Sequence, residues 1–136
     1  MKKAVKYILT ITALVCLILL TGIMLNGCGP KYKQISQDEA IQMMQDQSGY
    51  LIVDVRRADE FAEGHIPGAV NVSNESIQEE DPDQLSLLPD REQILLVYCR
   101  SGNRSKKAAQ KLAELGYTNV YEFGGINTWE GEIVTD

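Results

Sequence analysis

The chain has 136 residues, enough for one domain of ordinary size, and its 44% hydrophobic content is typical of a globular protein. Its net charge of −6 at pH 7, without an extended basic segment, argues against nucleic acid as a partner. Of its three cysteines, only Cys99 lies beyond residue 28. The folded domain therefore cannot form an internal disulfide, and a dithiol oxidoreductase of the Cys-x-x-Cys kind is disfavoured.

The N-terminal segment 1–27 has the pattern of an export signal or membrane anchor. Three lysines within the first six residues precede residues 7–30, which carry no charge. The segment ends in Leu25-Asn26-Gly27-Cys28, which resembles the signal of bacterial lipoproteins. That resemblance implies cleavage before Cys28, which would become the first residue and carry a thioether-linked diacylglycerol. The apolar run is also long enough, at about 19 residues, to span a bilayer, so an uncleaved transmembrane helix is the alternative.

Either tether predicts a domain held at the cell membrane on its extracytoplasmic side. We expect residues 28–34 to be a linker and residues 35–136 to form the folded domain. The domain alternates strand and helix signals, which is typical of a parallel α/β sheet. The first half begins with a strand around Tyr32–Ile35 and a helix opened by the capping box at Ser36–Glu39 and ending near Asp46. It continues with a strand over Tyr50–Val55, a helical turn over Asp59–Ala62, a brief strand after the turn-rich residues 64–71, and a short helix with a surface loop over Asn74–Arg91. The second half has a strand at Ile94–Val97, a helix from Ser105, a strand over Asn119–Phe123, and a final helix containing Trp129.

A short loop after the strand at Ile94–Val97 carries the candidate chemistry. The apolar run indicates a buried central strand, and Cys99 follows it at the carboxyl end. The loop consists of Arg100, Ser101, Gly102, Asn103 and Arg104, and a helix begins directly after it. Free backbone N–H groups at a helix start lower the pKa of a facing thiol, so we expect a reactive thiolate. A buried structural cysteine is the alternative, but a glycine and two arginines within the next five residues favour the reactive one.

Charge is distributed unevenly along the chain. Removing the three leader lysines from the net charge of −6 leaves about −9 for residues 28–136. Yet no acidic residue occurs between Glu92 and Glu114, a stretch that holds five of the ten remaining positive residues. An acidic domain with one basic spot predicts a small anionic substrate. The lysines of this stretch are expected on a solvated helix face.

The ordered motifs of the domain resemble those of the rhodanese family of single-domain sulfurtransferases. They are Val53-Asp54-Val55-Arg56, Glu60-Phe61, the run from Gly64-His65-Ile66-Pro67-Gly68 to Asn71, the Cys-x-x-Gly-x-Arg loop, and Gly124-Gly125 with Trp129. The resemblance implies a doubly wound, five-stranded parallel sheet with helices on both faces. It also implies that Cys99 accepts sulfane sulfur from a donor such as thiosulfate and passes it on, as a persulfide, to cyanide or a thiol. One departure stands at Glu132, where the family often has a proline.

The remaining site residues are expected to act around Cys99, with no cofactor or metal. Loop amides would stabilise the anionic persulfide, while Arg104 would orient the loop or neutralise the donor. Arg100 would face the mouth and meet the incoming anion. Asp54 would hydrogen-bond the backbone of a loop near the mouth of the site, and His65 would be a structural residue of its turn.

Two other functions remain open at this level. The first is a phosphatase or an oxyanion reductase on the same fold, which would bind its anion in a similar loop. Phosphatases of this architecture have one more residue between cysteine and arginine than the four found here, so the loop length favours sulfur over phosphate. The second is a non-catalytic module that binds a protein partner and leaves its thiol idle.

Overall fold

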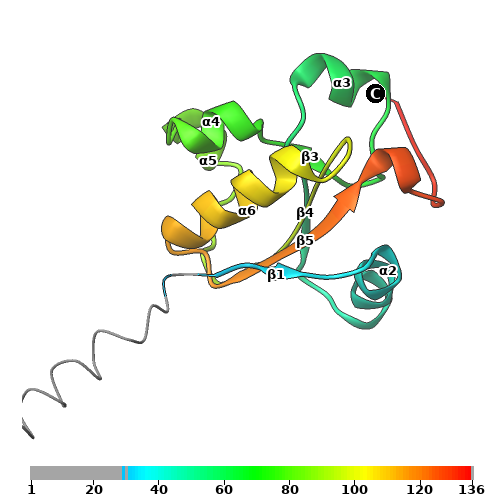
Figure 1. Cartoon of the computed structure of the whole chain (residues 1–136), viewed down its shortest axis with the longest axis horizontal. Helices are drawn as coiled ribbons and strands as arrows, with labels where there is room; N and C mark the ends of the chain where they lie inside the picture. The colour runs from blue at the N-terminus through cyan, green and yellow to red at the C-terminus, as the bar shows by residue number, and fades with distance from the viewer. Residues whose placement is uncertain (1–28, 30, 136) are drawn as a thin grey trace, which may run out of the picture.

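A computed structural model describes residue 29 and residues 31–135 of the chain. The described residues form a five-stranded, entirely parallel sheet in the order β1-β5-β4-β2-β3. Figure 1 shows α6 lying along β4 and β5. The elements in chain order are β1 (Lys33–Gln34), α2 (Gln37–Asp46), β2 (Leu51–Asp54), α3 (Ala58–Glu63), β3 (Val70–Asn71), α4 (Asn74–Gln78), α5 (Pro82–Leu85), β4 (Ile94–Cys99), α6 (Asn103–Glu114), β5 (Asn119–Gly125) and the 3-10 turn η1 (Ile126–Thr128).

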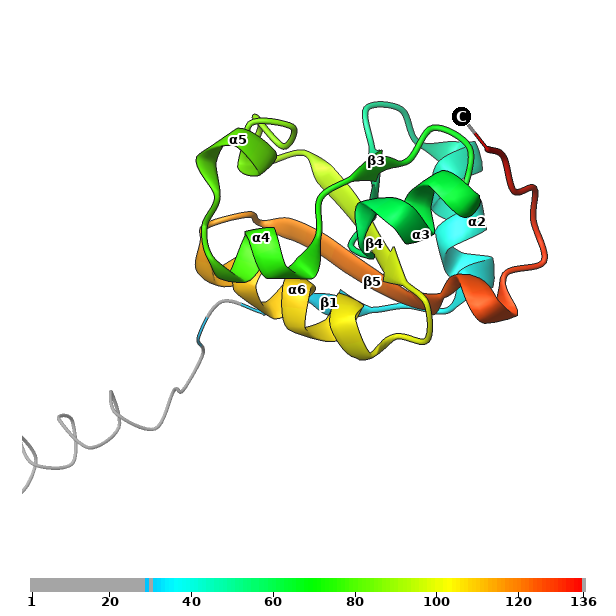
Figure 2. The same ribbon diagram turned by 90° about the horizontal axis from the view of Figure 1, so that it is seen from above.

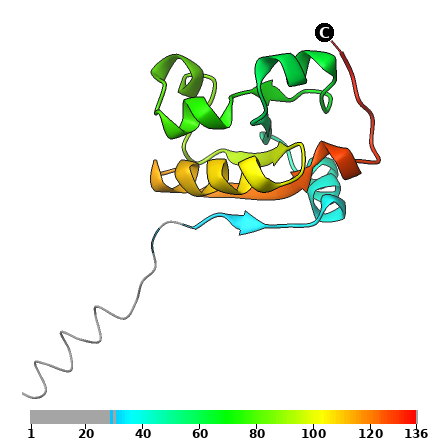
Figure 3. The same cartoon turned by 45° about the horizontal axis from the view of Figure 1, so that its top comes forward.

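Strand β4 is the middle strand of the sheet, and both of its faces are covered. Leu95, Val97 and Cys99 belong to the apolar cluster that includes side chains of α4 and α6. Leu96 and Tyr98 point to the other face and pack with Ala40 of α2. This two-sided burial explains the continuous apolar run of the strand and confirms the predicted fold class. In Figure 3 the helices α3, α4 and α5, drawn in green, lie at the end of the sheet that carries β3.

The local start signals of the sequence hold in the structure. Ser36 accepts a hydrogen bond from the backbone N–H of Glu39, whose carboxylate accepts one from the Ser36 N–H at 2.7 Å, so the predicted capping box is formed. Helix α6 buries Ala108, Ala109 and Leu112 on the side that faces β4 and β5. Its apolar spacing therefore places one helical face on the sheet.

The C-terminal part differs from the prediction, since Trp129 does not lie in a helix. Strand β5 continues through Gly125, and only the three residues of η1 turn before Trp129 becomes extended. The Trp129 ring packs against Phe123, with their centroids 5.8 Å apart, and its Nε1 donates to the Glu132 carbonyl at 3.2 Å. Anchoring the indole between these partners ends the turn. Figure 2 shows the C-terminal segment turning back toward the green loop that follows α3, where Val134 and His65 exchange backbone hydrogen bonds of 2.9 Å.

Two further details refine the predicted elements. The segment 74–91 contains two short helices, because Ser73 caps α4 and Asp81 followed by Pro82 caps α5. Strand β1 lies within the segment 28–34 and pairs with β5 at the sheet edge. The predicted signal or anchor at 1–27 and Cys28 lie outside the described residues. In the part of the chain that the structure describes, no helix combines the length and apolar character needed to cross a membrane.

Candidate active site

The thiol of Cys99 lies where β4 ends and the loop to α6 begins. A register shift between Val97 and Cys99 pairs the cysteine with Gly125 of β5, and the cysteine is only 1% exposed. Parallel strands present their carboxyl ends at one edge of the sheet, which is the usual place for a binding site in an open α/β fold. The predicted position of the cysteine at the end of a buried strand is the one observed.

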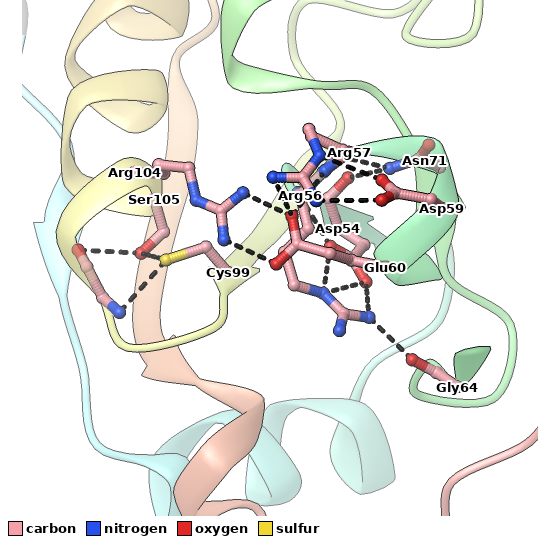
Figure 4. A network of polar contacts seen from close by, with 11 residues as sticks. Asp54, Arg56, Arg57, Asp59, Glu60, Gly64, Asn71, Cys99, Arg104 and Ser105 are labelled. Atoms are coloured by element: carbon pink, nitrogen blue, oxygen red, sulfur yellow. Dashed lines mark hydrogen bonds and ion pairs between the residues drawn. The ribbon is translucent and has the colours of Figure 1, made fainter. Parts of the chain in front are cut away.

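Hydrogen bonds converge on the sulfur from the loop and the first turn of α6. The Gly102 backbone N–H donates to Sγ at 3.1 Å, and the thiol lies 3.4 Å from Ser105 Oγ. Figure 4 shows the sulfur facing Ser105. Gly102 makes this geometry accessible because its φ of 96° lies in the left-handed region.

These contacts change the acidity of the thiol. Burial by itself raises the pKa of Cys99, since a charge is less stable away from water. The hydrogen bonds from the Ser105 hydroxyl and from the backbone N–H groups of Ser105, Ser101 and Gly102 outweigh that effect. The pKa of Cys99 is consequently lower than that of an ordinary thiol.

Strand β5 and the turn η1 that follows it pack against the loop that begins at Arg100. The Asn127 N–H donates to the Arg100 carbonyl at 3.1 Å. A Cβ atom at Gly125 would stand 2.1 Å from the same carbonyl oxygen, so only a glycine fits there. The Gly-Gly pair of the sequence motif is thus the surface on which the loop rests.

The second arginine of the loop is paired with a carboxylate of α3. Arg104 donates to both oxygens of Glu60, at 2.6 and 2.9 Å, and Figure 4 shows the two side chains pointing toward one another. This two-pronged contact joins the start of α6 to α3. The hydrogen bond from Arg104 lowers the pKa of Glu60 from 4.5 to about 2.

A second ion pair organises the turn between β2 and α3. The buried Asp54 carboxylate accepts hydrogen bonds from the Arg56 backbone N–H at 2.9 Å and from its guanidinium, with the shortest at 2.6 Å. Arg56 also donates to the Gly64 carbonyl at 2.7 Å. The His65 ring, next to this carbonyl, stacks on Phe61 with centroids 3.8 Å apart. Both Asp54 and His65 therefore shape the turn.

The structure gathers part of the predicted residue set at the sulfur. Gly102 touches it, Arg100 and Ser101 are exposed on the same loop, and Asn103 is exposed as the first residue of α6. Four residues with roles in the site had not been assigned one from the sequence. Arg56 and Glu60 stand in the quoted motifs, so the motifs are the signal that could have found them. Ser105 and Glu122 stand outside those motifs. Ser105 meets the sulfur in the first turn of α6, and Glu122 meets the Ser105 hydroxyl only because β5 packs against α6. Among residues 29 and 31–135, no group of three or more His, Cys, Asp or Glu side chains is arranged to hold a metal ion.

Comparisons with known proteins agree with this geometry. The sequence profile of the Rhodanese-like domain matches residues 36–132. The thiosulfate sulfurtransferase GlpE of Coxiella burnetii is 39% identical over 100 residues, which cover 73% of this chain and 88% of the relative. The protein of the same name from Shewanella oneidensis is 35% identical over 99 residues, covering 72% and 92%.

Solved structures show the same similarity. A rhodanese-like domain protein from Staphylococcus aureus has a TM-score of 0.65 at 30% identity, covering 76% of this chain and 98% of the other. A rhodanese with anions from E. coli has a TM-score of 0.56 at 29% identity, covering 64% and 99%. The chain therefore belongs to the rhodanese family. Its enzyme class is that of the sulfurtransferases.

Proposed function

We propose that this protein is a membrane-tethered sulfurtransferase that moves sulfane sulfur from a small anionic donor such as thiosulfate to a thiophilic acceptor. The single observation that carries the proposal is the Cys99 sulfur, 1% exposed and held by the Gly102 N–H at 3.1 Å in a loop that lowers its pKa. The choice of thiosulfate as donor is supported by the similar proteins, which are named thiosulfate sulfurtransferases.

The reaction divides into two displacements at sulfur. The Cys99 thiolate attacks the outer sulfur of thiosulfate, a new S–S bond forms, and sulfite leaves with the electron pair of the broken bond. An acceptor such as cyanide then attacks the outer sulfur of the persulfide, so thiocyanate forms and the Cys99 thiolate is regenerated. No proton is transferred in either step, and the kinetics should be ping-pong.

The loop has separate parts for holding the intermediate and for meeting the donor. Backbone N–H groups that stabilise the thiolate also face the place where the persulfide charge develops. The exposed side chain of Arg100 is available to the incoming anion, whereas Arg104 is held by Glu60. We accordingly assign donor attraction to Arg100 and loop orientation to Arg104.

The proposed tether is supported by the N-terminal sequence. Lysines at the start, the uncharged residues 7–30 and the lipoprotein-like Leu25–Cys28 favour a lipid on Cys28 and a domain outside the cytoplasm. A donor and an acceptor would then be met at the extracytoplasmic surface of the cell membrane.

The persulfide itself is the test of the catalytic proposal. Full-length protein is incubated with thiosulfate, and the mass of the tryptic peptide that ends at Arg100 is measured by mass spectrometry. We expect a gain of about 32 Da on Cys99 that cyanide removes. In the matched Cys99→Ser variant we expect no gain and a loss of transfer of at least about 1000-fold, with the unfolding midpoint unchanged. A wild-type protein that gains no mass but hydrolyses a phosphoester would contradict the proposal.

A further inference from the structure

A buried carboxylate lies on the far side of the sulfur's serine partner. Glu122 of β5 is 2% exposed, and its Oε1 accepts hydrogen bonds from Ser105 Oγ at 2.6 Å and from the Gly124 N–H at 2.9 Å. Its Oε2 lies 3.4 Å from Gln34 Nε2 of β1. A buried carboxylate is expensive to hold, and these three neutral donors offset that cost. In the proposed sulfur transfer, neither displacement at sulfur involves this carboxylate as a reacting group.

Ser105 stands between the carboxylate and the sulfur and has a single hydrogen to donate. Its Oγ lies 2.6 Å from Glu122 Oε1, 3.0 Å from the Gly102 carbonyl, and 3.4 Å from both the Gly124 carbonyl and Cys99 Sγ. A hydroxyl donates one hydrogen bond and accepts others. Charged acceptors at 2.5–2.7 Å form the strongest of such bonds. The carboxylate therefore takes the hydrogen, and the Ser105 oxygen is left as an acceptor for the Cys99 thiol.

We propose that Glu122 is a positioning residue that sets the charge state of Cys99 by competing for the Ser105 hydrogen. In the thiol form, S–H points to Ser105 Oγ and Ser105 O–H points to Glu122. When the thiol proton leaves to solvent, the thiolate needs that same hydrogen as a donor. Glu122 thus holds the acidity of the thiol below the level that the loop alone would give.

Other ionisable groups lie near Cys99 and Glu122, but they do not replace the competition for the Ser105 hydrogen. Arg104 and Cys99 interact through their charges, and the charge of Glu122 acts on the Tyr32 hydroxyl. Glu122 and the sulfur, by contrast, share the Ser105 hydroxyl directly.

The competition has a chemical use in the two-step transfer. A thiol with a lower pKa is a better leaving group but a weaker nucleophile, and attack is fastest when its pKa lies near the ambient pH. Cys99 attacks in the first step and leaves in the second. The inference rests on the proposed function, in which Cys99 works as a thiolate, but it can be tested without any sulfur donor.

The test is the pH dependence of Cys99 alkylation by iodoacetamide in the full-length protein, followed on the tryptic peptide that ends at Arg100. For Glu122→Gln we expect the midpoint to fall by about one pH unit. The plateau rate constant should fall about threefold, because nucleophilicity declines with pKa. Glu92→Gln is the matched control, since it removes an exposed carboxylate near the other end of β4 and should leave the midpoint unchanged.

The Ser105→Ala background shows whether the serine carries the effect. There, Glu122→Gln should shift the midpoint by less than about 0.3 pH unit. An equal fall in that background, or an unchanged or raised midpoint in the single Glu122→Gln variant, would overturn the inference.

Gln34→Leu keeps the test open if Glu122→Gln does not fold, because Gln34 is exposed on the edge strand. Removing its amide leaves the carboxylate more dependent on Ser105, so the alkylation midpoint should rise by about 0.3 pH unit. A fall would count against the inference. Sulfur transfer that fails while these midpoints move as expected would instead count against the proposed function.

Discussion

Opposing effects meet at the Cys99 sulfur. Removal from water disfavours the thiolate, and a ring of hydrogen-bond donors favours it. The donors prevail because most of them are backbone N–H groups fixed by the turn at Gly102 and the start of α6. Backbone donors need little reorganisation when the charge forms, so the residue is prepared for chemistry before any substrate arrives.

Another residue of the quoted motifs, His65, has a role that is separable from catalysis. Its ring stacks on Phe61, and the residue is buried and exchanges backbone hydrogen bonds with Val134. We expect His65→Ala to lower the free energy of unfolding by about 2 kcal/mol through lost packing, with kcat changed less than about threefold. Urea unfolding and steady-state sulfur transfer measure the two effects. A large loss of kcat at full stability would show that His65 takes part in the reaction.

Contacts between elements place the loop against its surroundings. The Arg104–Glu60 pair links α6 to α3, and Gly125 of β5 lies directly under the Arg100 carbonyl. The loop is therefore held from two directions by parts of the chain that are far apart in sequence. This arrangement explains why motifs in different elements accompany the cysteine motif.

The ion pair between α3 and α6 predicts a pH-dependent stability. The folded-state pKa of Glu60 is about 2, below its ordinary 4.5, so its contribution is present above pH 4.5 and is lost as the pH falls toward 2. We expect Glu60→Gln to cost about 1–2 kcal/mol at pH 7, less than full linkage gives because the pair is partly exposed. The difference from wild type should shrink at pH 3 in urea titrations.

Asp59→Asn is the control for this prediction, because the Arg57–Asp59 pair is exposed on the same helix. Its removal should change the free energy of unfolding by less than about 0.5 kcal/mol at either pH. A Glu60→Gln protein as stable as wild type at pH 7 would show that the pair only orients the loop.

At the scale of the whole molecule, the parallel sheet brings the carboxyl ends of β2 and β4 to one edge. Asp54 and Cys99 end these two strands, and the loops that follow them carry the Asp54–Arg56 pair and the sulfur cradle. An acidic domain thereby presents its basic loop at one place, where an anion can be drawn in.

The tether is a prediction about the entire chain. If Cys28 is lipidated, the mature protein begins at that residue, and intact mass spectrometry of membrane-extracted protein should find a diacylated N-terminus. Cys28→Ser should then leave the leader uncleaved. A wild-type protein that keeps Met1 and residues 2–27 would point to the transmembrane anchor.

Much of this protein could be predicted from its sequence because the decisive signals are local. The apolar run of β4, the capping box at Ser36 and the glycine after Cys99 each follow from steric and solvation preferences of a few neighbouring residues. The end of the chain was predicted incorrectly, because Trp129 follows its packing partner Phe123 rather than helical propensity.

By itself, the sequence determined the α/β class, the parallel sheet and the cysteine at a strand end, since hydrophobic spacing and turn residues act over short distances. Only the tertiary structure decided which side chains meet. The Arg104–Glu60 pair joins residues 44 positions apart, and Ser105 reaches Glu122 across 17. The physical reason is that a hydrogen bond depends on ångströms between atoms, which are set by how β5, α6 and α3 pack on β4 and not by any local pattern.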